Sequence, residues 1–123
     1  MQSPGSGPPS SGGVTRDDAA AMNALTGERM EPPASSIRWV FDPDGVFRLV
    51  DHTNPDACTS ETGTWTLIEG LRYSDNGGGV IARVQTKFDT AREFTIQLPN
   101  AMPDGAIVDG EQFTRSRSLP GSC

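Results

Sequence analysis

The sequence is short of the residues that most enzymatic and metal-binding chemistry requires. Its 123 residues include one histidine, one lysine and two cysteines, and the cysteines do not form a C-x-x-C pair. Two cysteines are too few for a structural zinc site and lack the spacing of a thioredoxin-like redox motif. We therefore expect no metal and no cofactor, and we favour a binding function over an enzymatic one.

The short motifs that could suggest catalysis or ion binding are incomplete. His52 lies beside Asp51 and near Ser60, but no nucleophile elbow or oxyanion motif accompanies these residues. Asp42 and Asp44 resemble the start of a calcium loop, yet the later acidic ligands are missing. We interpret the first group as a solvated loop and the second as a hairpin turn.

Positive charge is also scarce. Sixteen acidic and ten basic side chains give a net charge of -6, and the basic residues do not cluster. Such a chain repels the phosphates of nucleic acids and anionic membrane surfaces. No stretch approaches the roughly 20 consecutive apolar residues of a membrane span. We expect no nucleic-acid partner, and membrane attachment only through an N-terminal lipid anchor.

The first 14 residues predict a flexible tether. Residues 2–13, QSPGSGPPSSGG, contain no large apolar side chain and are rich in Pro, Gly and Ser. Such a segment commonly follows a cleaved export or lipoprotein signal, and an ordinary disordered terminus can have the same composition. Residues 15–123 then form one domain, and we expect a secreted, periplasmic or cell-surface protein.

The two cysteines favour the same compartment. A bridge between Cys58 and Cys123 would close a loop of about 66 residues and stabilise the fold by about 4 kcal/mol in the chain-entropy model. This bridge needs an oxidising compartment. Two free thiols, or an intermolecular bridge through Cys123, are the alternatives.

A short helix is predicted immediately after the tether. Thr15 is the expected N-cap of a segment that runs to Leu25, with Asp18 in a capping-box position and Gly27 near the C-terminal end. About two turns are too few to be stable alone, so the side bearing Met22 and Leu25 should rest on the domain. We expect this helix to close one end of the domain.

After Pro32 and Pro33 the hydrophobic period changes from helical to two, which predicts strands. Turn-forming residues separate short segments of this kind along the rest of the chain. The expected strands are 37–41, 46–51, 62–68, 71–73, 80–88, 93–98, 107–108 and 111–117. Seven or eight short antiparallel strands at close spacing predict an all-β fold, either a barrel or a sandwich.

Four short motifs follow one another between residues 25 and 117. They are LTG at 25–27, FDPDGVF at 41–47, GTW at 63–65 and FTR at 113–115, with Arg29 standing where the first motif would continue to a tryptophan. In this order they resemble the small bacterial lipocalin-like domains, a branch of the calycin barrels. The resemblance implies a small antiparallel up-and-down barrel of about eight strands with a small interior cavity, often in an exported protein.

The last predicted strand contains the candidate polar anchor. Phe113, Arg115 and Arg117 share one face at period two, so an inward Phe113 brings both guanidinium groups inward. A buried arginine must be paired, and an inward Arg115 either meets an internal carboxylate or holds an anionic ligand such as a fatty-acid carboxylate. The alternatives are that Phe113 alone is inward, or that Arg117 lies outside the rim.

Aromatic side chains are the candidate apolar wall of the cavity. Trp39, Trp65 and Tyr73 lie on predicted strands, and together with Phe113 and the two arginines they are the expected ligand-binding residues. The same aromatic side chains could instead fill a solid core, because a packed barrel and a hollow one both need inward aromatic residues.

Three functions compete on these grounds. We favour an exported barrel that binds a small apolar or amphiphilic ligand, with the Arg115 region as its polar anchor. The second hypothesis is a protein-interaction module with a packed interior, for example an inhibitor of an extracellular protease. The third is an enzyme that shapes its substrate in the cavity without a recognisable motif.

Overall fold

Period-two segments of the chain form strands, because alternate side chains of an extended backbone point to opposite faces. The computed structural model describes residues 13–121; most of the predicted tether, residues 1–12, lies outside the described residues. The elements are β1 (Val14–Arg16), α1 (Asp18–Leu25), β2 (Arg29–Glu31), β3 (Ile37–Phe41), β4 (Val46–Asp51), β5 (Thr59–Tyr73), η2 (Asp75–Gly77), β6 (Gly79–Lys87), β7 (Ala91–Pro99), β8 (Gly105–Val108) and β9 (Glu111–Arg115).

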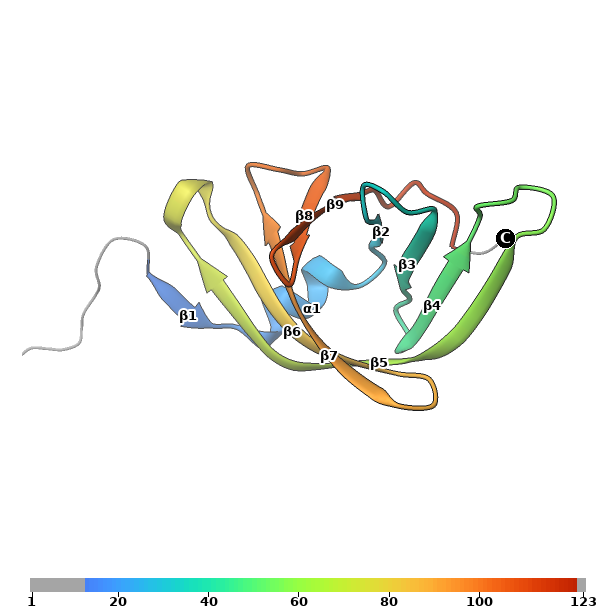
Figure 1. Ribbon diagram of the computed structural model, residues 1–123. Coiled ribbons are helices and arrows are strands. Elements are labelled where there is room, and N and C mark those ends of the chain that lie inside the picture. The colour runs from blue at the N-terminus through green and yellow to red at the C-terminus, as the bar shows by residue number, and fades with distance from the viewer. Residues whose placement is uncertain (1–12, 122–123) are drawn as a thin grey trace, which may run out of the picture.

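Strands β2 to β9 close into an eight-stranded antiparallel barrel (Figure 1). Each strand pairs with the next one in sequence, and β9 pairs with β2 to complete the circuit. The short strand β1 lies outside this circuit and pairs with the end of β5. The predicted all-β up-and-down barrel with one short helix is confirmed.

The long strand β5 joins two segments that the sequence predicts as separate strands. Its first half pairs with β4 and its second half with β6, and the register with β6 shifts between Leu67 and Glu69. A bulge of this kind bends a strand and increases its twist, which lets one strand serve two neighbours around a barrel. Figure 1 shows the resulting curve of β5 beneath the barrel.

The start of the helix differs from the prediction. Asp17 is the N-cap, and its side chain accepts a hydrogen bond from the backbone N–H of Ala20. Thr15, the expected cap, lies in β1 instead, and Val14, which was assigned to the tether, pairs with Tyr73. The prediction failed because pairing with β5 takes residues 14–16 into a strand, so the next capping residue along the chain begins the helix.

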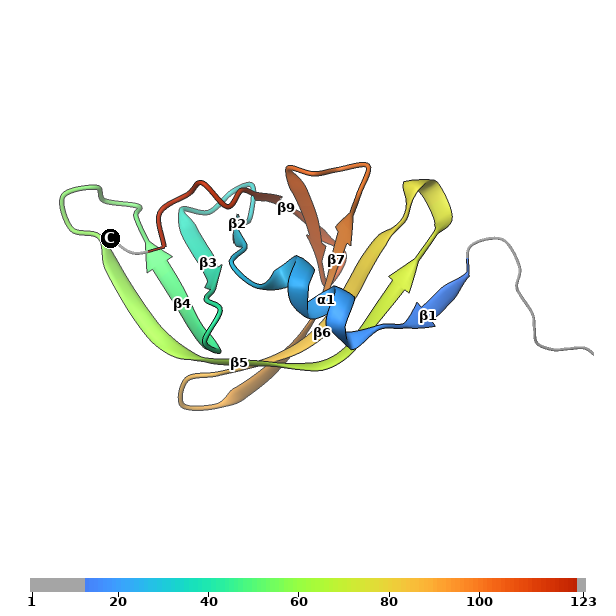
Figure 2. The same cartoon turned by 180° about the vertical axis from the view of Figure 1, so that it is seen from behind.

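Helix α1 packs across the inside of one barrel end (Figure 2). Its Ala21 and Leu25 are fully buried in the core, whereas Met22, expected on the packed side, is 37% exposed. Gly70 of β5 makes the close approach possible: a Cβ there would lie 2.4 Å from the Cβ of Ala21. None of the helices within residues 13–121 has the length and apolar character that crossing a membrane requires.

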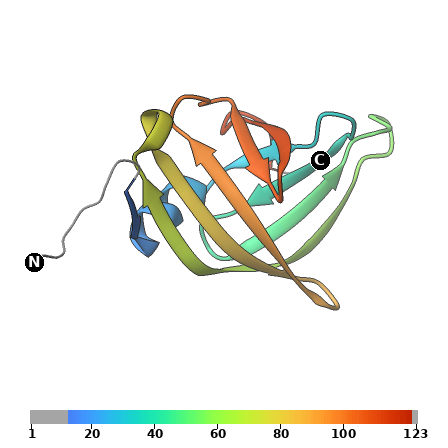
Figure 3. The same cartoon turned by 60° about the vertical axis from the view of Figure 1, so that its left-hand side comes forward.

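The two ends of the barrel carry different structures. The helix end contains α1, the β3–β4 turn and the β5–β6 and β7–β8 connections. The loop end contains the β2–β3, β4–β5, β6–β7 and β8–β9 connections, and Figure 3 shows the β6–β7 hairpin extending beyond its neighbours there. Between the ends lies a core of buried inward side chains that includes Phe41, Phe47, Trp65, Val84, Ile96 and Phe113.

The outer face of β3 and β4 is also buried, which period two alone does not predict. Arg38, Val40 and Val50 point away from the core and are nearly or fully buried. The segment after β9 runs along this side of the barrel, and the carbonyl oxygen of Pro120 accepts a 3.1 Å hydrogen bond from Arg38 Nη1. The segment between β9 and Pro120 is thus packed against the barrel wall.

The structure describes one of the two cysteines of the predicted disulfide. Cys58 lies half-buried in the β4–β5 connection at the loop end. Cys123 lies outside the described residues, so the bridge between the two remains a prediction.

Candidate ligand-binding pocket

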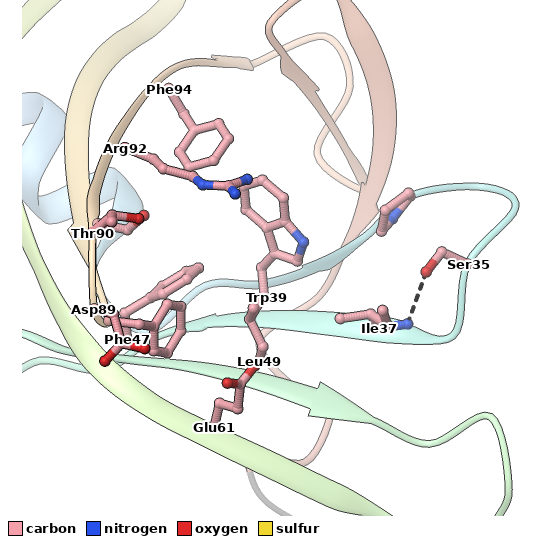
Figure 4. Close-up of a pocket in the computed structure, with 13 residues that line it drawn as sticks. Ser35, Ile37, Trp39, Phe47, Leu49, Glu61, Asp89, Thr90, Arg92 and Phe94 are labelled. Atoms are coloured by element: carbon pink, nitrogen blue, oxygen red, sulfur yellow. Dashed lines mark hydrogen bonds between the residues drawn. The ribbon is translucent and has the colours of Figure 1, made fainter.

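A pocket of about 450 Å³ opens at the loop end of the barrel. Inward side chains of β3, β4, β6 and β7 form its walls, and the β2–β3 and β6–β7 connections form its rim (Figure 4). The apolar lining comprises Pro32, Ile37, Trp39, Phe47, Leu49, Phe88 and Phe94, and the polar lining comprises Ser35, Glu61, Thr86, Asp89, Thr90 and Arg92. The pocket is therefore an apolar chamber with a mixed polar rim.

Trp39 forms the central wall of this pocket. Its ring meets those of Phe94, Phe113 and Phe47 edge-on, with centroid distances of 4.8, 5.1 and 6.0 Å. Edge-to-face aromatic pairs at such distances each contribute about 0.5–1.5 kcal/mol beyond the area they bury. The indole is therefore held in one position by rings from three other strands while one side faces the pocket.

Thr86 and Arg92 are the polar pair on the opposite wall. They are cross-strand partners in the β6–β7 register, and each lies at period two from apolar inward residues of its own strand. Thr86 is 3% exposed and Arg92 is exposed at the rim. Neither side chain hydrogen bonds or forms an ion pair with any residue between 13 and 121. Figure 4 shows the guanidinium of Arg92 directed toward Trp39.

Two carboxylates complete the rim. Glu61 lies opposite Leu49 in the β4–β5 register, and Asp89 lies in the β6–β7 connection. Both are exposed, and neither lies within ion-pair distance of Arg92 in the described structure. The charges around the mouth are thus solvated rather than neutralised by one another.

Arg115, the predicted polar anchor, is engaged at the helix end. Its side chain is 11% exposed and lies 3.5 Å from a carboxylate oxygen of Glu28, which is 7% exposed. The same guanidinium donates to the carbonyl oxygens of Pro99, Met102 and Gly105. Of the two alternatives for an inward Arg115, the structure shows the internal carboxylate.

Arg117 lies beyond the end of β9 and is 54% exposed. Its Nε donates to Glu28 at 3.1 Å, and its terminal nitrogens donate to the carbonyl oxygens of Asn23, Ala24 and Thr26. These carbonyls belong to the last turn and C-cap of α1, where the helix leaves its acceptors without intrahelical partners. A positive charge at the C-terminal end of a helix also interacts favourably with the helix dipole, so Arg117 caps α1.

The other predicted binding residues lie in three different places. Phe113 packs against Trp39 behind the pocket wall. Trp65 is 2% exposed in the core, and its indole N–H donates to the carbonyl oxygen of Asp42. The hydroxyl of Tyr73 accepts a hydrogen bond from Gln97, which lies on the outer face of β7. Of the six predicted residues, Trp39 lines the pocket and Phe113 supports it.

The motifs set aside in the sequence have structural partners. His52 lies 2.9 Å from a carboxylate oxygen of Glu31 on the outer face, and the described structure gives it no hydrogen bond to Ser60. Thr53 lowers the pKa of Asp51 through hydrogen bonds from its hydroxyl and its backbone N–H. No group of three potential metal-ligating side chains occurs within residues 13–121.

Sequence patterns could have found Thr86 and Arg92. The predicted strand 93–98 leaves Arg92 outside it, whereas β7 begins at Ala91, and Arg92 then continues the inward series of Phe94, Ile96 and Leu98. On β6 the inward series of Val80, Ala82 and Val84 continues to Thr86 in the same way. A polar residue at the end of an inward apolar series is the signal for a pocket rim.

Comparison with protein-family models, with curated proteins and with solved structures gave no match. The likeness to lipocalin-like domains therefore stays a prediction that rests on the four motifs and the closed barrel.

Proposed function

We propose that this barrel binds a small apolar or amphiphilic molecule in the loop-end pocket. The main support for this proposal is the pocket itself, which has a volume of about 450 Å³, is open at one end and is walled mainly by aromatic and aliphatic side chains. Small-molecule sites typically have volumes of about 300–1,000 Å³, apolar walls and a few polar groups that fix orientation. The pocket meets each of these criteria.

The arrangement of the aromatic rings supports binding without rearrangement. Trp39 is fixed by its contacts with Phe47, Phe94 and Phe113 and still presents a face to the pocket. A wall that is already ordered loses little side-chain entropy when a ligand arrives. The barrel interior is filled at the helix end and hollow at the loop end, which favours a binding role over that of a fully packed interaction module.

The neutral dye N-phenyl-1-naphthylamine tests this proposal, because its fluorescence rises when it enters an apolar site. We expect saturable binding to the wild type and at least tenfold weaker binding to Leu49→Trp, since the larger ring would occupy the pocket beside Trp39. Thr66→Trp is the matched control, because Thr66 is exposed on the outward face of β5. Absence of saturable binding, or equal binding by both variants, contradicts the proposal.

A further inference from the structure

We propose that Thr86 and Arg92 form a headgroup subsite, and that the ligand is an amphiphile with one anionic group. This inference rests on the proposed function, since it assigns the polar end of a molecule whose apolar part lies against Trp39. Both residues line the pocket and are direct neighbours across β6 and β7.

The hydroxyl of Thr86 has no hydrogen-bond partner within residues 13–121, and the residue lines the pocket. The residue as a whole is 3% exposed. Thr86 Oγ1 is not among the fully buried unpaired polar atoms of the described residues, so in the empty pocket water can be its partner. A ligand atom that accepts a hydrogen bond from the pocket side would replace that water.

Arg92 differs from every other arginine of the chain. The remaining eight each donate to or pair with a carboxylate or a carbonyl oxygen, as Arg115 and Arg117 do at the helix end. Arg92 alone has no such partner in the described structure, and its guanidinium is directed toward the pocket wall at Trp39 (Figure 4). A guanidinium is weakly hydrated, lies well against aromatic faces and grips a carboxylate with two parallel hydrogen bonds.

Because two carboxylates also lie at the rim, the inference predicts in which direction the affinity changes when each rim charge is removed. Glu61 and Asp89 cannot donate a hydrogen bond and would repel an anion held between Thr86 and Arg92. Removing the charge of Arg92 should therefore weaken binding of an anion, whereas removing that of Glu61 should strengthen it modestly. A cationic ligand would give the opposite order.

The experiment measures displacement of N-phenyl-1-naphthylamine by decanoate, decanol and decylamine, three compounds that share one chain and differ in headgroup charge. For the wild type we expect decanoate to compete best. Arg92→Gln should weaken decanoate about tenfold, the scale of one charge-assisted contact at a partly solvated site, and should change the affinity for decanol much less. Arg92→Lys should retain part of the preference, because it keeps the charge without the fork.

Arg83→Gln is the matched control, because it removes the same charge from an exposed position on the outward face of β6. Equal competition by decanoate and decanol, tighter binding of decylamine, or an unchanged decanoate affinity in Arg92→Gln overturns the headgroup assignment. In each of these outcomes the dye still binds, which separates them from failure of the proposed function, where the dye itself does not.

Discussion

Replacing Arg115 with methionine should strongly destabilise the protein in the absence of any ligand. The guanidinium donates to three carbonyl oxygens from the β7–β8 connection and its edges, and it faces the buried Glu28. Methionine fills a similar volume but leaves these acceptors unpaired. Breaking a buried ion pair by removing one partner costs about 3–5 kcal/mol. We expect a loss near the lower value, because Arg117 still pairs with Glu28 at 3.1 Å.

Urea denaturation followed by tryptophan fluorescence measures this loss. A domain of this size has a total unfolding free energy of about 5–15 kcal/mol, so a decrease of about 3 kcal/mol moves the midpoint clearly. Arg117→Met is the comparison: it also removes a guanidinium from Glu28, but its side chain is 54% exposed. Its loss should be about 1 kcal/mol, the scale of an exposed charge at a helix terminus.

A stability equal to or above that of the wild type would refute this reasoning. Such a result, combined with loss of decanoate binding, would instead make Arg115 a ligand anchor that is strained without its ligand. A double-mutant cycle with Glu28→Gln separates the ion pair from the carbonyl contacts, since only the former couples the two positions.

Four further predictions concern other parts of the molecule. Thr86→Val should leave the unfolding free energy of the ligand-free protein unchanged or raise it by up to about 1 kcal/mol in the same urea assay, because it replaces a hydroxyl that has no hydrogen-bond partner within residues 13–121 with a methyl group. Gly70→Ala should lower it by about 1–3 kcal/mol, because the added Cβ would meet α1 at 2.4 Å; near-ultraviolet circular dichroism would report the displaced helix. The pKa of Asp18 lies below its ordinary 3.8, chiefly through a hydrogen bond from Arg16, so its contribution is present above that pH and lost as pH falls through the folded-state value. Thermal scans should therefore separate wild type from Asp18→Asn at neutral pH and bring them together in acid. Cys58→Ser should cost up to about 4 kcal/mol if the predicted bridge forms, and non-reducing mass spectrometry of the wild type should show a mass lower by two hydrogens.

The barrel could be predicted because its signals are local. The strands 37–41 and 46–51 have the predicted boundaries, since Asp-Pro-Asp-Gly at 42–45 gives both a turn and the break in the period. The hydrogen bond from Val46 N–H to Asp44 shows the side chain stabilising that turn. The even spacing of such signals along the chain is sufficient to indicate a meander of antiparallel strands.

The candidate site was only partly predictable, because partners that are distant in sequence decide it. Nothing near Arg115 in the sequence indicates that Glu28, 87 residues earlier, meets it at the helix end. The burial of Arg38 likewise depends on the segment that follows β9, which contributes the carbonyl oxygen of Pro120. The local sequence pattern can place an arginine on one face of a strand, but it does not show whether a carboxylate from a distant part of the chain lies beside it.

The inward polar groups of the helix end have partners from the chain, whereas those of the loop end have none within residues 13–121. Removing them should therefore have different effects on the free energy of unfolding at the two ends. At the helix end, the donors of Arg115 are all directed at acceptors of the chain, so truncation must destabilise the empty protein. At the loop end, Thr86 and Arg92 have no such acceptors, so truncation should leave the empty protein as stable or more stable and weaken only the bound state. If Thr86→Val is at least as stable as the wild type and binds decanoate more weakly, the loop end is the functional half of the barrel. If the variant is less stable, Thr86 contributes to the packing of the core instead.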